Sequence, residues 1–217
     1  MSTTITMNNY FTSVRYDISK YIPKNVRRVL EIGCGDANFV KFLPTCEYWG
    51  VEPNIKVKQI KSLNIFKIYK CDYENAYDQM PDNYFDLIIV NDVVEHMTDH
   101  DYFLETIKKK MTQDSYIIGS VPNVRHISNL INLIIHKDWQ YQSSGILDKT
   151  HLRFFTTKSL IRSLNLHGYY IELVQPINRQ LCKRLRFKCL IERVLCLLLG
   201  RDTEFNQLIF CVRKNRH

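Results

Sequence analysis

The sequence lacks the features that mark membrane-spanning, secreted and zinc-binding proteins. No apolar run reaches the ~18 residues that a membrane-spanning helix needs. Residues 1–6 contain no basic segment leading into an apolar one, so we expect no secretory signal. The seven cysteines include no Cys-x-x-Cys pair, which fits free thiols in a reducing compartment better than disulfides or zinc. We therefore expect a cytoplasmic protein.

Internal repeats and low-complexity linkers are also missing, so we treat residues 1–217 as a single domain, long enough for a substantial core. The formal net charge is +8 and the pI is near 9.1. This charge favours an anionic partner, such as a phosphorylated substrate, a membrane surface or nucleic acid. Charge by itself does not choose among these partners, and it is also compatible with simple solubility.

The most informative stretch combines a short apolar run with two glycines. Residues 29–32 are of the kind that form a strand buried on both faces. Gly33 and Gly35 then interrupt the run, and the apolar spacing over 39–43 predicts a helix. Because glycine has no Cβ, such a turn allows a ligand to approach the backbone closely.

Two acids accompany this turn and suggest a nucleotide-type ligand. Glu31 precedes the turn and offers an acceptor to an ammonium or amide group. Glu52 ends a predicted strand about 20 residues further on, where a ribose-binding acid belongs. Asn38 stands where the dinucleotide fingerprint has its third glycine, which disfavours NAD and favours a ligand without a pyrophosphate.

The alternation of short strands with helices predicts an α/β fold with a doubly wound, mostly parallel, Rossmann-like sheet of seven strands. We expect strands over 29–32, 48–53, 65–70, 85–90, 115–121, 169–174 and 207–212. Helices are expected over 10–22, 101–111 and 157–167, and an apolar helix is expected to end at about Ile135. Helical insertions follow the fifth strand and separate the sixth from the seventh.

Three segments extend this fold. A helix within residues 1–24 is expected to close over the ligand as a lid, and residues 122–156 form an insertion on the substrate side. The pattern of residues 179–200 predicts a basic amphipathic helix. Three alternatives are open for its apolar face: it packs against the core, lies on an anionic membrane or docks a partner.

A bound metal ion can lower the pKa of a substrate's hydroxyl group. The acids and histidines that follow the fourth strand are dense enough to raise the idea: Asp92, Glu95, His96, Asp99 and His100. No third ligand is evident at a defined spacing, and a capped helix start explains the acids as well, so we expect no metal.

The stretch from Glu31 to Asp36 resembles the first motif of class I S-adenosylmethionine-dependent methyltransferases, with Ala37 where the commonest form has a third glycine. Residues 91–96, 121–126 and 145–156 resemble a bacterial-type subgroup associated with surface polysaccharides and other sugar pathways.

The resemblance implies S-adenosylmethionine as cofactor and a seven-stranded sheet whose last strand is antiparallel. It implies that Glu31, Gly33 and Gly35 surround the methionine part, Glu52 binds the ribose, Asp72 and Tyr73 lie by the adenine, Asn91 lies near the sulfonium, and Tyr10 and Arg15 belong to the lid. We expect His96 to cap the same pocket.

A sugar hydroxyl must lose a proton when it is methylated, and histidine is the natural general base. Among His96, His126 and His151 we favour His151, with Asp148 to orient its imidazole; His126 either binds substrate or acts as the base. Arg125 and Arg153 are candidates for binding an anionic group of the substrate, such as a phosphate.

The sequence therefore predicts a methyltransferase acting on a hydroxyl of a sugar or glycan-type acceptor, phosphorylated or nucleotide-linked. N-methylation of an amino sugar and a cofactor-binding but inactive partner subunit remain alternatives. So does an RNA methyltransferase, although the stretch after the fourth strand lacks the Asn/Asp-Pro-Pro-Tyr/Phe pattern and no RNA-binding module is evident. The oligomeric state is open.

Overall fold

The computed structural model describes residues 15–54, 64–181 and 187–215. The predicted N-terminal helix over 10–22 lies partly outside these residues, and Tyr10 lies outside them altogether. Its described part contains one short helix, α2 (Tyr16–Ser19).

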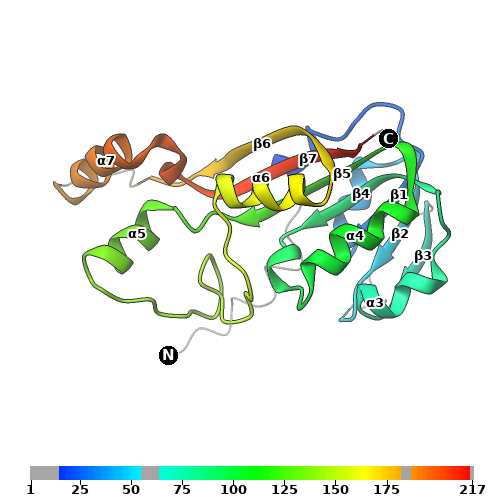
Figure 1. The fold of residues 1–217 in the computed structure, drawn as a ribbon, viewed down its shortest axis with the longest axis horizontal. Helices are drawn as coiled ribbons and strands as arrows, with labels where there is room; N and C mark the ends of the chain where they lie inside the picture. The colour runs from blue at the N-terminus through cyan, green and yellow to red at the C-terminus, as the bar shows by residue number, and fades with distance from the viewer. Residues whose placement is uncertain (1–14, 55–63, 182–186, 216–217) are drawn as a thin grey trace.

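A seven-stranded sheet forms the centre of the molecule, in the strand order β3-β2-β1-β4-β5-β7-β6 (Figure 1). Its strands are β1 (Arg28–Ile32), β2 (Glu47–Val51), β3 (Ile65–Tyr69), β4 (Phe85–Asn91), β5 (Met111–Pro122), β6 (Tyr169–Arg179) and β7 (Phe205–Lys214). Only β7 runs antiparallel to its neighbours, β5 and β6. The predicted fold class and the antiparallel last strand are both confirmed.

The sheet has a hydrophobic core on each face. Successive residues of the central strands contribute side chains to these two cores in turn, because the side chains point to opposite faces of the sheet. Leu30 and Ile88 belong to the first core, which is covered by α3 (Tyr73–Ala76), α4 (His100–Lys110) and α6 (Thr157–Leu166). Val29 and Leu87 belong to the second, with Ile18 of α2. Figure 1 shows α4 and α6 over one face of the sheet.

The segment after the glycine turn differs from the prediction. It forms a 3₁₀ helix, η1 (Asn38–Phe42), instead of an α-helix, and it begins after Ala37 in a left-handed conformation with φ 53°. Phe39 and Val40 are buried there, as their apolar spacing predicted. The helix itself is wound more tightly than an α-helix.

The predicted basic helix over 179–200 is wrong at its amino end. The antiparallel pairing of β6 with β7 continues from Tyr169 opposite Lys214 to Arg179 opposite Phe205, so Arg179 ends a strand. The helix in this region is α7 (Phe187–Leu199). In the described part of the chain, no helix combines the length and apolar composition needed to cross a membrane.

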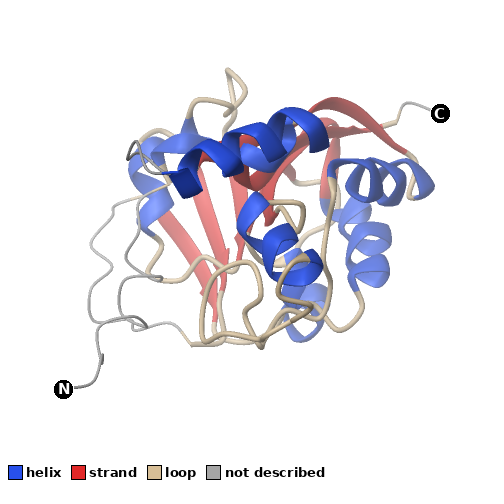
Figure 2. Ribbon diagram, turned by 90° about the vertical axis from the view of Figure 1, so that its left-hand side faces the viewer, coloured by secondary structure: helices blue, strands red, loops and turns tan. Residues whose placement is uncertain are grey.

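The insertion after β5 contains α5 (Ile127–Ile134) and a long irregular loop, and it returns to the sheet where Phe155 pairs with Asn123. In Figure 2, α5, α7 and this loop face the viewer, in front of the sheet. The short 3₁₀ helices η3 (Tyr77–Gln79), η4 (Val94–His96) and η5 (Arg201–Glu204) complete the fold.

Candidate active site

The glycine turn lies at the carboxyl end of β1, packed against the residues that follow β4. Gly33 and Gly35 have φ angles of 70° and 52°, in the left-handed region that favours glycine. A Cβ built on Gly33 would lie 2.3 Å from a methyl group of Val93. The turn therefore requires a glycine at position 33 both for its backbone angle and for its packing.

Glu52 holds this turn from the end of β2. One carboxylate oxygen accepts a hydrogen bond from the Gly35 backbone N–H at 3.1 Å, and the other accepts from the Asn54 N–H at 2.9 Å. The side chain is buried. A carboxylate has about four acceptor positions, so Glu52 keeps capacity for ligand hydroxyl groups beside the turn.

Glu31 lies behind the turn on β1 and is also buried. Its carboxyl group accepts a hydrogen bond from the Tyr48 hydroxyl. Burial raises the pKa of Glu31 to about 8, despite the opposing effects of Tyr48 and of the positive charge on Arg15. Glu31 is thus held mainly in its protonated form at neutral pH, and a nearby ammonium group would favour its ionisation.

The residues proposed for the adenine divide into one exposed and one buried side chain. Asp72 precedes α3 at the carboxyl end of β3 and is exposed. Tyr73 is buried, and its hydroxyl lies 2.9 Å from Thr106 Oγ1. The Tyr73 ring belongs to the core.

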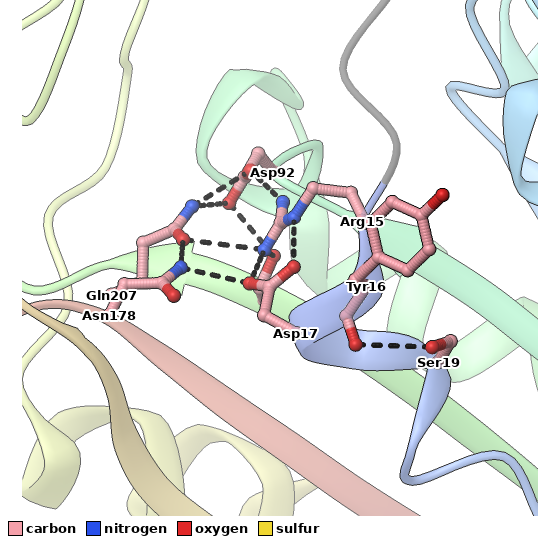
Figure 3. Close-up of polar contacts among 8 residues, drawn as sticks. Arg15, Tyr16, Asp17, Ser19, Asp92, Asn178 and Gln207 are labelled. Atoms are coloured by element: carbon pink, nitrogen blue, oxygen red, sulfur yellow. Dashed lines mark hydrogen bonds and ion pairs between the residues drawn. The ribbon is translucent and has the colours of Figure 1, made fainter.

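Arg15 lies at the carboxyl ends of β4 and β5 and at the amino end of the antiparallel β7 (Figure 3). Its guanidinium pairs with Asp92 after β4 and with Asp17 at 3.0 Å, and it donates to Ser120 of β5 at 3.2 Å and to Gln207 of β7 at 3.3 Å. Burial lowers the pKa of Arg15, but the two carboxylates raise it by more, so the charge is retained. These contacts within the protein fix the chain at Arg15 to this edge of the sheet.

Asn91, the last residue of β4, has a buried amide group. Neither its oxygen nor its nitrogen has a hydrogen-bond partner among the described residues. Leaving a buried polar group unpaired costs about 1–3 kcal/mol. A ligand that meets this amide would remove that cost, which fits the predicted position beside the cofactor.

The insertion folds back onto η4 and brings His151 to His96. The backbone N–H groups of Leu152 and Arg153 donate to the Glu95 carbonyl at 2.8 and 3.2 Å. The Arg153 guanidinium donates to the carbonyls of Met97 and Thr98 at 2.8 and 2.7 Å. The ring centroids of His96 and His151 are 4.7 Å apart as a result. Arg153 thus fastens the insertion, with its guanidinium occupied by carbonyl groups.

Ile146, and not Asp148, orients His151. The Nδ1 atom of His151 lies 2.9 Å from the Ile146 carbonyl oxygen, while Asp148 accepts hydrogen bonds from the backbone and hydroxyl of Thr150 at 2.8 and 2.7 Å. These bonds from Thr150 lower the pKa of Asp148, although burial opposes the shift. The role of Asp148 in this structure is to shape the loop before His151.

His126 and Arg125 fasten a different part of the insertion. His126 is buried, with Nδ1 at 2.8 Å from the Ser128 hydroxyl and Nε2 at 3.1 Å from the Gln180 carbonyl, and burial lowers its pKa. Arg125 pairs with Asp202 at 2.6 Å. Both residues join the insertion to the connection between β6 and β7, and the structure does not bring them into the cluster around His151.

From the sequence, Glu95 was considered only as one member of a possible metal cluster and was given no role in the site. Its side chain is 0% exposed, and neither carboxyl oxygen has a hydrogen-bond partner among the described residues. Burial, together with the negative charge of Asp92, raises the pKa of Glu95 well above its usual range. Its position directly before His96, after two valines, is the only local signal of its burial.

Known proteins share this architecture. A family described as "Methyltransferase domain" matches residues 7–174. The fold is similar to that of a SAM-dependent methyltransferase from Archaeoglobus fulgidus, with a TM-score of 0.66, 24% identity, and coverage of 95% of this chain and 97% of that chain. No curated protein matches the sequence.

Two further solved structures share the fold at lower identity. One is the Burkholderia thailandensis 1,6-didemethyltoxoflavin-N1-methyltransferase with bound S-adenosylhomocysteine, with a TM-score of 0.55, 13% identity, and coverage of 92% of this chain and 76% of that chain. The other is a Haloferax volcanii complex between the Trm112 activator and a methyltransferase, with a TM-score of 0.60, 10% identity, and coverage of 88% and 83%.

The sheet order and the glycine turn with its two acids define the class of protein, a Rossmann-like methyltransferase. Because the family match spans most of the sequence, the chain belongs to the methyltransferase-domain family. The predictions of a methyltransferase and of S-adenosylmethionine as its cofactor are confirmed.

Replacing Glu52 is expected to weaken cofactor binding. Glu52→Ala removes the acceptor that fixes the Gly35 N–H, and the loss of charge-assisted hydrogen bonds worth about 1.5–3 kcal/mol predicts a Kd for S-adenosylhomocysteine raised about tenfold or more. Isothermal titration calorimetry measures this change. Glu105→Ala, at an exposed glutamate of α4, is the matched control and should bind normally. Equal affinity of Glu52→Ala and wild type would contradict the assignment.

Glu31 is expected to make stability depend on pH. Its pKa rises from 4.5 to about 8 on folding, so the stabilisation is fully present below pH 4.5 and is lost as pH rises toward 8. Glu31→Gln stays neutral throughout. Urea denaturation between pH ~5 and ~8 should therefore show wild type losing stability relative to Glu31→Gln. A constant difference between the two proteins would refute the raised pKa.

Proposed function

We propose that the protein transfers the methyl group of S-adenosylmethionine to a hydroxyl group of a sugar or glycan-type acceptor, with His151 as general base. The observation that carries this proposal is that His151 of the insertion lies beside His96, which belongs to the segment that follows β4. In open α/β sheets, ligands bind at the carboxyl ends of the strands, and this segment lies at that edge.

The hydrogen bonding of His151 suits a proton acceptor. Its Nδ1–H donates to the Ile146 carbonyl, which fixes the tautomer and leaves Nε2 with a lone pair. The acceptor oxygen would attack the methyl carbon in line as the carbon–sulfur bond breaks and the sulfonium becomes a thioether. The hydroxyl proton would pass to Nε2. Holding the two reactants in line is the main contribution expected of the protein.

The cofactor would lie along the edge formed by β1, β2, β3 and β4. We assign the methionine part to the glycine turn and Glu31, the ribose to Glu52, the adenine to Asp72 and the Tyr73 backbone, and the sulfonium to Asn91. The unpaired Asn91 amide and the free acceptor positions of Glu52 support this assignment. Arg15 would hold the N-terminal segment over the bound cofactor.

The sugar acceptor rests on the resemblance of residues 121–126 and 145–156 to enzymes of sugar pathways. N-methylation of an amino sugar is the alternative, because a neutral amine needs a weaker base than a hydroxyl group. The toxoflavin relative is named as an N-methyltransferase, so this fold serves nitrogen acceptors too.

Replacing His151 separates these possibilities. If the acceptor is a hydroxyl group, His151→Gln should lower the rate of S-adenosylhomocysteine release by about 100-fold or more, the usual contribution of a general base. The assay uses a panel of nucleotide sugars and lipid-linked glycans, and cofactor affinity should not change. His136→Gln, in the exposed loop after α5, is the control. Full activity of His151→Gln would contradict the assignment of His151 as the general base.

We also propose that α7 rests on an anionic membrane surface. The helix leaves a row of apolar side chains exposed, and exposed apolar faces mark interaction sites: Leu190, Ile191, Val194, Leu197 and Leu198. The sequence around it is basic, as a peripheral membrane helix requires.

Vesicle sedimentation tests this contact. The protein should co-sediment with vesicles containing phosphatidylserine, and much less with phosphatidylcholine alone. Leu198→Glu, at a side chain that is 76% exposed, should abolish co-sedimentation, while Leu166→Glu, at a 78% exposed side chain of α6, should not. Failure to bind either kind of vesicle would contradict the membrane contact and favour a protein partner for α7.

A further inference from the structure

We propose that Glu95, His96 and His151 together bind one divalent transition-metal cation, such as Zn²⁺, Mn²⁺ or Co²⁺. One potential ligand atom from each of these side chains lies within 4.8 Å of the other two. No other group of three histidine, cysteine or acidic side chains in the described ranges has its ligand atoms this close.

The first argument is the unpaired carboxyl group of Glu95. It is fully buried and neither oxygen meets a hydrogen-bond donor in the described part of the chain. Burying a carboxyl group without partners is costly, and natural proteins leave few such groups. Arg15, a nearby cation, is already paired with Asp92 and Asp17. A metal ion between Glu95 and the two imidazoles would supply the missing partner.

The second argument is independent of the first and concerns the two imidazoles. Nδ1 of His151 lies 2.9 Å from the Ile146 carbonyl oxygen, and Nδ1 of His96 lies 3.2 Å from the Thr150 carbonyl oxygen. Metal-binding histidines commonly donate one ring N–H to a backbone carbonyl, which directs the other nitrogen at the ion. Both rings have this arrangement, with Nε2 available.

The cluster is held together by the contacts that fasten the insertion. The Glu95 carbonyl accepts the backbone N–H groups of the two residues after His151, and Arg153 binds the carbonyls of Met97 and Thr98. Asp148 in turn fixes Thr150, whose carbonyl faces His96. Asp148 is thus a positioning residue for the site, acting through Thr150.

The donor set selects the kind of ion. Two imidazole nitrogens and one carboxylate suit Zn²⁺, Mn²⁺, Fe²⁺ or Co²⁺, whereas Mg²⁺ prefers a shell of oxygen ligands. Three protein ligands also leave at least one coordination position open, as in catalytic metal sites. The structure therefore points to an ion that contacts a further molecule at this edge of the sheet.

The use of that open position rests on the proposed function. A bound ion would polarise the acceptor's hydroxyl group and lower its pKa. With the ion bound, His151 would act as a ligand, and the proton would leave to water as the hydroxyl oxygen bonds to the methyl carbon; His151 would accept the proton itself only in the metal-free protein. Binding of the ion itself does not depend on the identity of the acceptor.

The test titrates Co²⁺ into full-length protein that carries no histidine tag and has been dialysed against EDTA. We expect one equivalent to bind, with a visible absorption spectrum distinct from that of the aqueous ion, and Zn²⁺ to displace it. Glu95→Gln and His151→Gln should each raise the Kd for Co²⁺ by about tenfold or more, since even outer-shell partners are worth 10–100-fold. His136→Gln, which removes an exposed histidine, is the control and should bind normally.

An unchanged spectrum on adding Co²⁺, or equal Co²⁺ affinity in wild type, Glu95→Gln and His151→Gln, would overturn the metal site. Calorimetry with S-adenosylhomocysteine on each variant verifies that the fold is intact. The metal readout needs no acceptor, so it can succeed while sugar methylation fails. Methyl transfer that survives EDTA in a protein that binds no Co²⁺ would instead overturn the metal site and leave His151 as the base.

Discussion

The pairing of β4 with β1 on one side and β5 on the other is the constraint on which the site depends. It places Ile32 opposite Val90 and Asn91 opposite Ser120, so three strands end together at one edge. The glycine turn after β1 therefore meets Val93 after β4, at a distance that admits no Cβ on Gly33. A shift of one residue in these parallel registers would separate the turn from Asn91 and turn each side chain to the other face.

This edge concentrates buried polar and ionisable groups that the fold alone does not need. Burial raises the pKa of Glu31 and Glu95, and the Asn91 amide has no partner among the described residues. Groups of this kind lower stability unless something binds them. A cofactor with an ammonium group and ribose hydroxyls, an acceptor and a metal ion would satisfy them in turn. Arg15 is the exception, because Asp92 and Asp17 already neutralise it.

Sequence reasoning succeeded where the signal was local. The apolar runs of β1 and β4 predicted buried central strands, and the spacing of Gly33 and Glu52 along one βαβ unit predicted that the glycine turn and the end of β2 lie together. It failed at the 3₁₀ helix η1, where apolar spacing does not distinguish two helix types, and at Arg179, where pairing with β7 extends a strand into a predicted helix. It also paired Asp148 with His151, although a backbone carbonyl takes that place.

The sequence by itself determined the class of fold and the cofactor, since each depends on periodicity or on motifs within short stretches. Only the tertiary structure decided that His151, which is 55 positions after His96 in the chain, lies against it beside the buried Glu95. The physical reason is that backbone hydrogen bonds from Leu152 and Arg153 to the Glu95 carbonyl join the two segments. Such bonds between main-chain groups leave no trace in the identity of side chains.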